Sequence, residues 1–155
     1  MHIKPGAILT SSPSLKDPHF TETIILLTEY NKNGATGFIV NKTFPRRLNE
    51  LEEFKYSNPV TLYDGGPVDK EHLFFIHQRP DVIEGGGRIA DTIYMGGNFR
   101  QAITHVNNRT LSEKDIKIFV GYCGWEHAQL EEEIAEGSWH IINANTEIIF
   151  ATGKI

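Results

Sequence analysis

Gly121-Tyr122-Cys123-Gly124-Trp125 runs directly into Glu126-His127-Ala128-Gln129-Leu130-Glu131-Glu132-Glu133-Ile134, and this stretch is the most informative part of the chain. Two glycines bracket the Tyr-Cys pair and permit backbone angles that other residues avoid. The apolar run before the motif predicts a strand at 117–120, and the helical pattern after it predicts a helix over 126–136. We therefore interpret the motif as a strand-to-helix corner that the glycines shape and Trp125 anchors.

The helix expected after this corner has a buried side and a solvated side. Leu130 and Ile134 mark the buried stripe, because residues four apart lie on one face of a helix. Glu132, Glu133 and Glu136 are predicted to form the face in contact with water.

Cys123 is the one cysteine of the chain, so no internal disulfide can form. A helix N-terminus close behind it would lower the pKa of its thiol and favour a nucleophile. Against this, Glu126 would oppose a thiolate in the first helical turn, and no neighbouring sequence feature supplies a base. We predict instead a small buried residue packed behind a glycine turn.

The remaining sequence predicts many short strands with single helices between them. A hairpin with a four- or five-residue loop is expected around Asn31–Gly34, and Asn98 with Gln101 fits the amide version of a capping box. The expected helices are a short one at 48–54 and a longer one from Asn98 to Val106. The expected strands lie at 6–10, 23–28, 36–40, 60–63, 73–77, 89–95, 139–143 and 147–150. This order predicts a single domain over 1–155 of class α+β, a mixed β-sheet closing toward a barrel with a few helices packed outside.

The composition limits the kinds of partner. The chain has 155 residues and a net charge of −5, which disfavours direct nucleic-acid binding through the phosphate backbone. No apolar run approaches the roughly 20 residues needed to cross a membrane, and the N-terminus does not resemble a signal peptide. We therefore expect a cytoplasmic protein with no membrane association.

No motif for a metal or cofactor is visible in the sequence. His72 and His77 are five residues apart on an expected strand, so they should point to opposite faces and cannot bind one metal ion together. The glycines at 85–87 fit neither a dinucleotide-binding nor a Walker pattern. The sequence thus predicts no metal, no cofactor and no recognisable catalytic set.

Taken in chain order, several segments of the sequence resemble the YqgE/AlgH family of bacterial proteins. The similar segments are Gly6-Ala7-Ile8-Leu9, Ile25-Leu26-Leu27, Gly37-Phe38-Ile39-Val40-Asn41, Gly65-Gly66-Pro67-Val68, and the opening motif with Gln129-Leu130-Glu131. The resemblance implies a compact α+β domain with a barrel-like mixed sheet and a link to transcriptional regulation, but it supplies no catalytic residues. Family members usually carry Ala or Ser at the position of Cys123, which further weakens a thiol mechanism.

The leading functional hypothesis is a non-enzymatic regulatory or binding module with an unknown protein or small-molecule partner. Its candidate binding surface is formed by glycine-shaped turns and the residues around the corner: Asn41, Gly65, Gly66, Pro67, Tyr122, Trp125, Glu126 and Gln129. The alternative is a hydrolase-type enzyme at the same corner that uses Glu126, Gln129 or His77.

Overall fold

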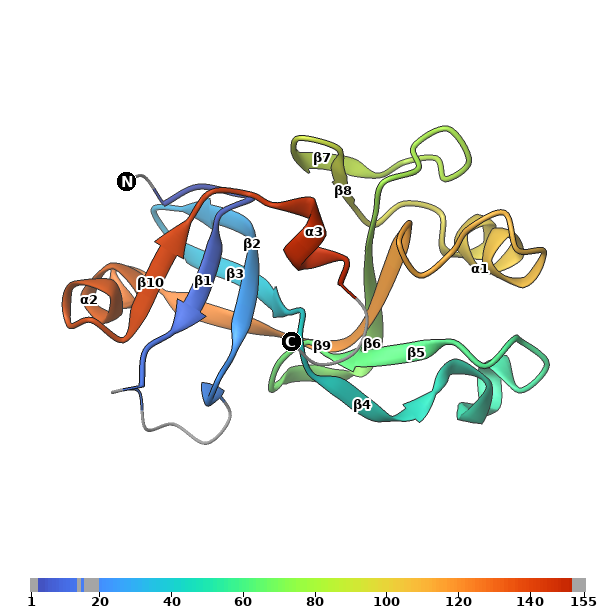
Figure 1. Ribbon diagram of the computed structural model, residues 1–155, viewed down its shortest axis with the longest axis horizontal. Helices are drawn as coiled ribbons and strands as arrows, with labels where there is room; N and C mark the ends of the chain where they lie inside the picture. Colours follow the sequence, from blue (N-terminus) through green and yellow to red (C-terminus); the bar gives the residue numbers. More distant parts are fainter. Residues whose placement is uncertain (1–2, 14, 16–19, 152–155) are drawn as a thin grey trace.

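The computed structural model describes residues 3–13, 15 and 20–151. Their ten strands form one hydrogen-bonded sheet that three α-helices cover, as Figure 1 shows. The strands are β1 (Ile8–Ser11), β2 (Ile24–Asn31), β3 (Gly34–Ile39), β4 (Thr43–Arg47), β5 (Thr61–Asp64), β6 (Val68–His77), β7 (Gly87–Ala90), β8 (Ile93–Met95), β9 (Ile116–Glu126) and β10 (Trp139–Ile142). The helices are α1 (Phe99–Asn107), α2 (Gln129–Ala135) and α3 (Thr146–Ile149), with 3-10 turns η2 (Leu48–Glu50) and η3 (Glu52–Phe54).

Strand β9 is the spine of the sheet. Its first half pairs with β5 in parallel and with β6 antiparallel, and its second half pairs antiparallel with β3. In Figure 1, β1, β2, β3, β10 and α2 therefore lie at the left, around the second half of β9, and β4 to β8 with α1 lie toward the right, around its first half. The α+β class and the mixed sheet are confirmed. The sheet does not close, because its path through the described strands ends at β10 and at β7.

The opening motif lies inside β9, so the predicted strand-to-helix corner is wrong. Cys123 and Trp125 are buried while Gly124 and Glu126 are exposed, which is the alternation of a strand. The helix begins only at Gln129, after Ala128 in a left-handed conformation with φ 65°.

Gly121 explains how one strand serves both halves of the sheet. Phe119 and Tyr122 contact the same central core cluster although they are three residues apart, an odd separation that a regular strand does not allow. Between them, Gly121 adopts φ +77°, and opposite it β6 loses register between Val68 and Leu73. These features mark a bulge in the β6–β9 ladder at Gly121, where residues 69–72 of β6 lie opposite this one residue of β9, and beyond it the second half of β9 pairs with β3.

Four further expectations differ from the structure. The short helix expected at 48–54 is two successive 3-10 turns, η2 and η3. The hairpin of β2 and β3 has a two-residue loop, Lys32-Asn33, and is otherwise confirmed. The strand expected at 89–95 is a second hairpin, β7 and β8. The strand expected at 147–150 is the short helix α3, because the Asn145 side chain accepts a hydrogen bond from the Ile148 backbone N–H and caps a helix start.

Helix α1 is confirmed with a modified cap. The Asn98 side chain accepts a hydrogen bond from the Gln101 backbone N–H at 3.0 Å, as predicted. The Gln101 side chain, however, accepts from the backbone N–H of Glu84 and so ties α1 to the glycine loop at 85–87 rather than closing the box. The buried face of α1, Ala102 and Val106, packs on β5, β6 and β9.

Candidate functional site

The glycine turn after β5 packs directly against the motif in β9. A Cβ on Gly66 would lie 2.3 Å from the carbonyl carbon of Tyr122, and a Cβ on Gly121 would lie 2.3 Å from the Gly66 oxygen. The Gly65 backbone N–H also donates to the Val120 carbonyl at 2.9 Å. Gly65, Gly66 and Tyr122 therefore lie together, and the close backbone packing requires glycine at positions 66 and 121.

Cys123 lies behind this turn, where the sequence predicted a buried thiol. Its Sγ donates to the Gly65 carbonyl at 3.4 Å, and its side chain is 1% exposed. Burial is the main cause that raises the pKa of the thiol to about 12. A thiol that remains protonated and enclosed is not a nucleophile at neutral pH.

A second group of predicted residues surrounds Glu133. Its Oε1 accepts hydrogen bonds from the indole N–H groups of Trp125 at 3.0 Å and Trp139 at 2.9 Å. Its Oε2 accepts from the Gln129 amide at 3.0 Å, and the Gln129 oxygen accepts from the Glu126 backbone N–H. The prediction that Glu133 faces water is therefore wrong, because its carboxylate joins α2 to the two buried tryptophans.

The other candidate residues are distributed along the sheet. Asn41 follows β3, where its side chain bonds the Ile24 backbone N–H and the Glu22 carbonyl, while Glu126 pairs with Gly34 at the other end of β3. The backbone on both sides of Asn41 bonds the glycine turn, since the Ile39 N–H donates to the Gly65 carbonyl at 2.9 Å and the Asp64 N–H donates to the Lys42 carbonyl at 2.8 Å. The structure thus separates two groups: Asn41 beside the glycine turn with Pro67 and Tyr122, and the cluster of Trp125, Glu126 and Gln129. That they contact a partner stays a prediction.

His77 is a core residue. It is fully buried, its Nε2 lies 3.0 Å from the Gly96 carbonyl, and its Nδ1 accepts from the Arg79 backbone N–H at 3.0 Å. The ring is therefore assigned as the neutral tautomer with the proton on Nε2. Burial is the main cause that lowers its pKa below the ordinary value of 6.5. His77 pairs with Ile116, ten residues or about 30 Å along β9 from Glu126, so the two cannot share a hydrolase site.

Lys117 carries a buried amine near the start of β9. Its Nζ donates to the carbonyls of Val40 at 2.8 Å and Ala151 at 2.9 Å, and it lies 4.2 Å from the centre of the Tyr63 ring. Burial is the main cause that lowers its pKa to about 7, while the Glu113 charge acts in the opposite direction. The sequence contained a signal here, a lysine interrupting the apolar run of 116–120, which marks a buried charge with dedicated partners.

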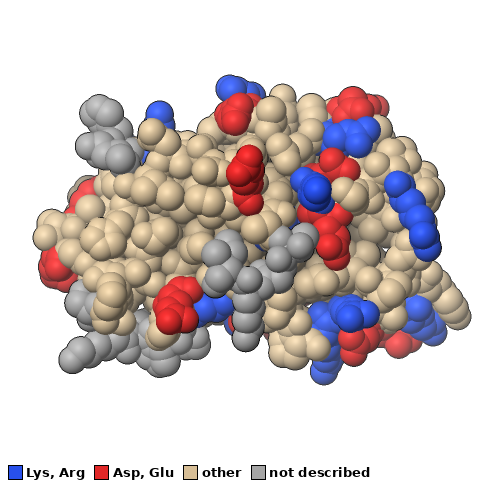
Figure 2. Space-filling model, in the orientation of Figure 1, with Lys and Arg blue, Asp and Glu red and all other residues tan. Residues whose placement is uncertain are grey.

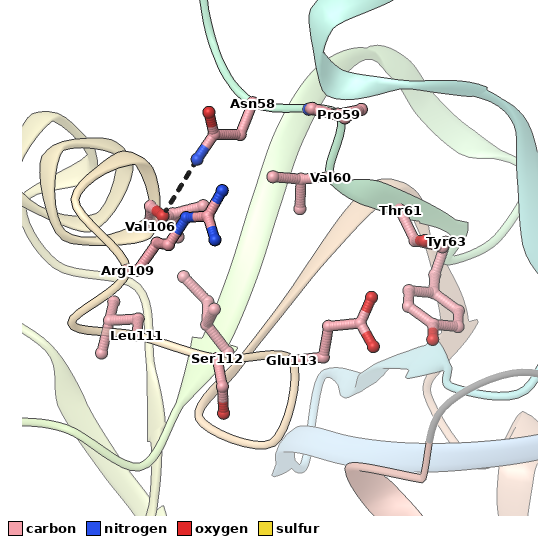
Figure 3. A pocket seen from close by; sticks show the side chains of 11 residues that line it. Asn58, Pro59, Val60, Thr61, Tyr63, Val106, Arg109, Leu111, Ser112 and Glu113 are labelled. Atoms are coloured by element: carbon pink, nitrogen blue, oxygen red, sulfur yellow. Dashed lines mark hydrogen bonds between the residues drawn. The ribbon is translucent and has the colours of Figure 1, made fainter.

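A cavity of about 480 Å³ opens beside Tyr63, between the segment that leads into β5 and the loop that follows α1 (Figure 3). Its wall is mainly apolar, with Val60, Val106, Leu111 and Ile116. The remaining lining residues are Asn58, Pro59, Thr61, Tyr63, Arg109, Ser112 and Glu113. The sequence predicted no functional role for this region, since its residues come from separate segments.

Hydrogen bonds between side chains and the backbone hold the two walls of this cavity together. The Asn58 backbone N–H donates to the Asn107 side chain at 2.8 Å, and the Asn58 amide donates to the carbonyls of Val106 and Asn107. On the opposite side, the Asp115 carboxylate caps the turn at Ser112 through the Ser112 backbone N–H at 2.9 Å. The cavity is therefore preformed, as small-molecule sites usually are.

Within the described ranges, no three His, Cys, Asp or Glu side chains cluster closely enough to hold a metal ion. No helix in the same part of the chain is long and apolar enough to cross a membrane.

The fold and site define a class of α+β protein in which one long strand, β9, joins two sets of strands and a lateral cavity opens beside its first half. The chain belongs to the AlgH-like family, whose model matches residues 8–154. The resemblance noted from the sequence is thereby confirmed.

Two relatives show the extent of the similarity. A UPF0301 protein of Chlorobaculum tepidum is 34% identical over 148 residues, which are 96% of this chain and 79% of that protein. A UPF0301 protein of Cytophaga hutchinsonii is 36% identical over 146 residues, covering 94% of this chain and 80% of the other.

Two solved structures are also similar. The solution structure of the AlgH protein from Pseudomonas aeruginosa has a TM-score of 0.77 and 27% identity, covering 97% of this chain and 82% of that one. A crystal structure of protein DIP2367 from Corynebacterium diphtheriae has a TM-score of 0.80 at 20% identity, covering 97% and 81%, and shows the fold alone.

Proposed function

We propose that this protein is a non-enzymatic, cytoplasmic binding module that takes a small molecule into the cavity between β5 and the loop after α1. The observation that carries the proposal is the preformed, mainly apolar cavity of about 480 Å³ with polar groups at its rim. Occupancy of this cavity would be the regulatory signal, in keeping with the link to transcription that the family resemblance implies.

The state of the reactive side chains supports a non-enzymatic role. The Cys123 thiol is enclosed with a raised pKa, and both ring nitrogens of His77 have internal partners. Gln129 is a candidate residue of the hydrolase hypothesis, and its side-chain amide is hydrogen-bonded to the Glu133 carboxylate and to the Glu126 backbone. Catalysis needs a nucleophile and a base within hydrogen-bond reach of each other and of a substrate, and these residues do not offer that arrangement.

The charge distribution supports a ligand other than nucleic acid. The net charge is −5, and on the face shown in Figure 2 basic side chains are interspersed with acidic ones. Binding to a phosphate backbone depends on several clustered Lys and Arg residues.

A fragment screen observed by methyl NMR tests the proposal. Fragments that occupy the cavity should shift the methyl signals of Val60, Val106 and Leu111, which come from its different walls. Val60→Phe should fill the cavity and abolish these shifts. Val68→Phe is the matched control, because Val68 is exposed on β6 and does not line the cavity. A diverse library that leaves all three methyl groups unshifted in the folded protein would refute the proposal.

A further inference from the structure

We propose that the cavity beside Tyr63 recognises a small zwitterion with an apolar body, such as a short apolar peptide with free ends. The inference rests on the proposed function, since it names the class of ligand for the same cavity. It follows from two side chains of opposite charge, Arg109 and Glu113, which flank apolar lining residues. In Figure 3 the two side chains rise from one loop on either side of the cavity, with Val60 on the wall between them.

Arg109 supplies the cationic end. Its backbone has φ +68°, a left-handed conformation that is costly for a residue with a side chain, and its N–H bonds the Val106 carbonyl at 3.2 Å. Among the described residues its guanidinium has no acidic partner within 4.0 Å. A guanidinium presents parallel N–H groups that match the two oxygens of a carboxylate.

Glu113 supplies the anionic end. It follows Ser112 in the turn that Asp115 caps, so its backbone is held in place. The charge of its carboxylate favours a higher pKa for the Lys117 amine. That amine nevertheless donates its hydrogen bonds to the carbonyls of Val40 and Ala151 and not to Glu113. No ion pair within 4.0 Å involves Glu113 in the described part of the chain, which leaves the carboxylate oxygens open to a ligand ammonium.

The apolar wall selects between ligand classes. A neutral apolar ligand would partly desolvate both charges without compensating either, which costs free energy. A simple anion would satisfy Arg109 but would also approach Glu113, where like charges repel. A zwitterion places one charge at each end and an apolar body against Val60 and Ile116.

Three dipeptide probes separate these cases: leucyl-leucine, N-acetyl-leucyl-leucine and leucyl-leucinamide. We expect leucyl-leucine to bind most tightly by methyl NMR titration. Blocking either end should weaken binding about fivefold to tenfold, because each exposed charge-assisted contact is weaker than a buried one.

Two substitutions with matched controls assign the ends. Arg109→Gln should remove the preference for the free carboxylate and keep the preference for the free amine. The control is Arg100→Gln, which replaces an exposed arginine on α1 and should change neither preference. Glu113→Gln should remove the preference for the free amine, and Glu132→Gln, an exposed residue of α2, should not.

The outcomes separate this inference from the function on which it rests. The zwitterion inference is overturned, and the proposed function stands, if fragments occupy the cavity but the dipeptides behave in one of three ways. These are equal binding of all three, binding only when one end is blocked, and no binding at all. If neither fragments nor dipeptides shift the cavity methyl groups, both are overturned. A preference for leucyl-leucine that persists in Arg109→Gln and Glu113→Gln also overturns the inference.

Discussion

Replacing Glu133 with alanine should destabilise the protein far more than its place on a seven-residue helix suggests. Glu133 is half-buried, and its carboxylate accepts hydrogen bonds from Trp125, Trp139 and Gln129. Trp125 is 7% exposed and Trp139 is 2% exposed, so water has little access to the two indole N–H groups once the carboxylate is gone.

The magnitude follows from these contacts. A hydrogen bond to a charged group contributes about 1.5–3 kcal/mol, and a stranded buried donor costs about 1–3 kcal/mol. The partial exposure of Glu133 reduces both effects, so we expect Glu133→Ala to lower the free energy of unfolding by about 3 kcal/mol. Glu133→Gln keeps an acceptor oxygen for the indoles but loses the charge. We therefore expect it to lower the free energy of unfolding by about 1 kcal/mol.

Urea denaturation followed by tryptophan fluorescence measures this directly. The chain has two tryptophans, and both bond Glu133, so the fluorescence signal reports on this cluster. Circular dichroism on the same samples reports whether the rest of the fold unfolds with it. Glu132→Ala is the control, because Glu132 is exposed on the same helix and should cost a few tenths of a kcal/mol. A loss at Glu133→Ala no larger than this control would refute the reasoning.

Two other predictions concern backbone packing and pH. Gly66→Ala should lower the free energy of unfolding by about 2 kcal/mol or more, because its Cβ would lie 2.3 Å from the Tyr122 backbone; Gly87→Ala, where a Cβ meets nothing within 4 Å, should have a much smaller effect in the same urea titration. Proton NMR should show His77 titrating below 6.5 and His72 above it, because burial lowers the pKa of His77 and the Asp69 hydrogen bond raises that of His72. Since unfolded His77 takes up a proton that the folded ring resists, its contribution is present above about pH 6.5 and is lost as pH falls; a value for His77 at or above 6.5 would contradict this.

The sequence predicted local structure well wherever the pattern belonged to one element. The run at 23–28 predicted a strand, and Ile25, Leu26 and Leu27 are each fully buried within β2. Helix α1 and its Asn98 cap were likewise readable, because caps and apolar stripes depend on neighbours within a few residues. The buried Cys123 followed from the absence of any activating group nearby.

The course of β9 could not be read in the same way, because it depends on contacts distant in sequence. Gly121 is equally compatible with a corner and with a bulge; the partner β6, about fifty residues earlier, decides between them by losing register opposite it. Glu133 was assigned to the solvent face of a helix, since nothing local indicates that Trp139 returns on β10 to meet it. The cavity was missed for the same reason, as Asn58 and Arg109 meet only in three dimensions.

Lys117 links the wall of the cavity to the central strand of the sheet, so we infer that the two move together. Its amine joins Val40 after β3 to Ala151 after α3, and its charge faces Tyr63, whose ring lines the cavity. Because Lys117 lies on β9, four residues before the bulge at Gly121, the wall of the cavity is attached to the strand that both halves of the sheet share. A ligand that displaces the Tyr63 ring would therefore disturb the spine of the fold, whereas one that only adds contacts would stabilise it. Both ligands raise the melting temperature if they bind only the folded state, so the size of the shift distinguishes the two cases: it is smaller for the ligand that displaces the ring, because the disturbance weakens its affinity.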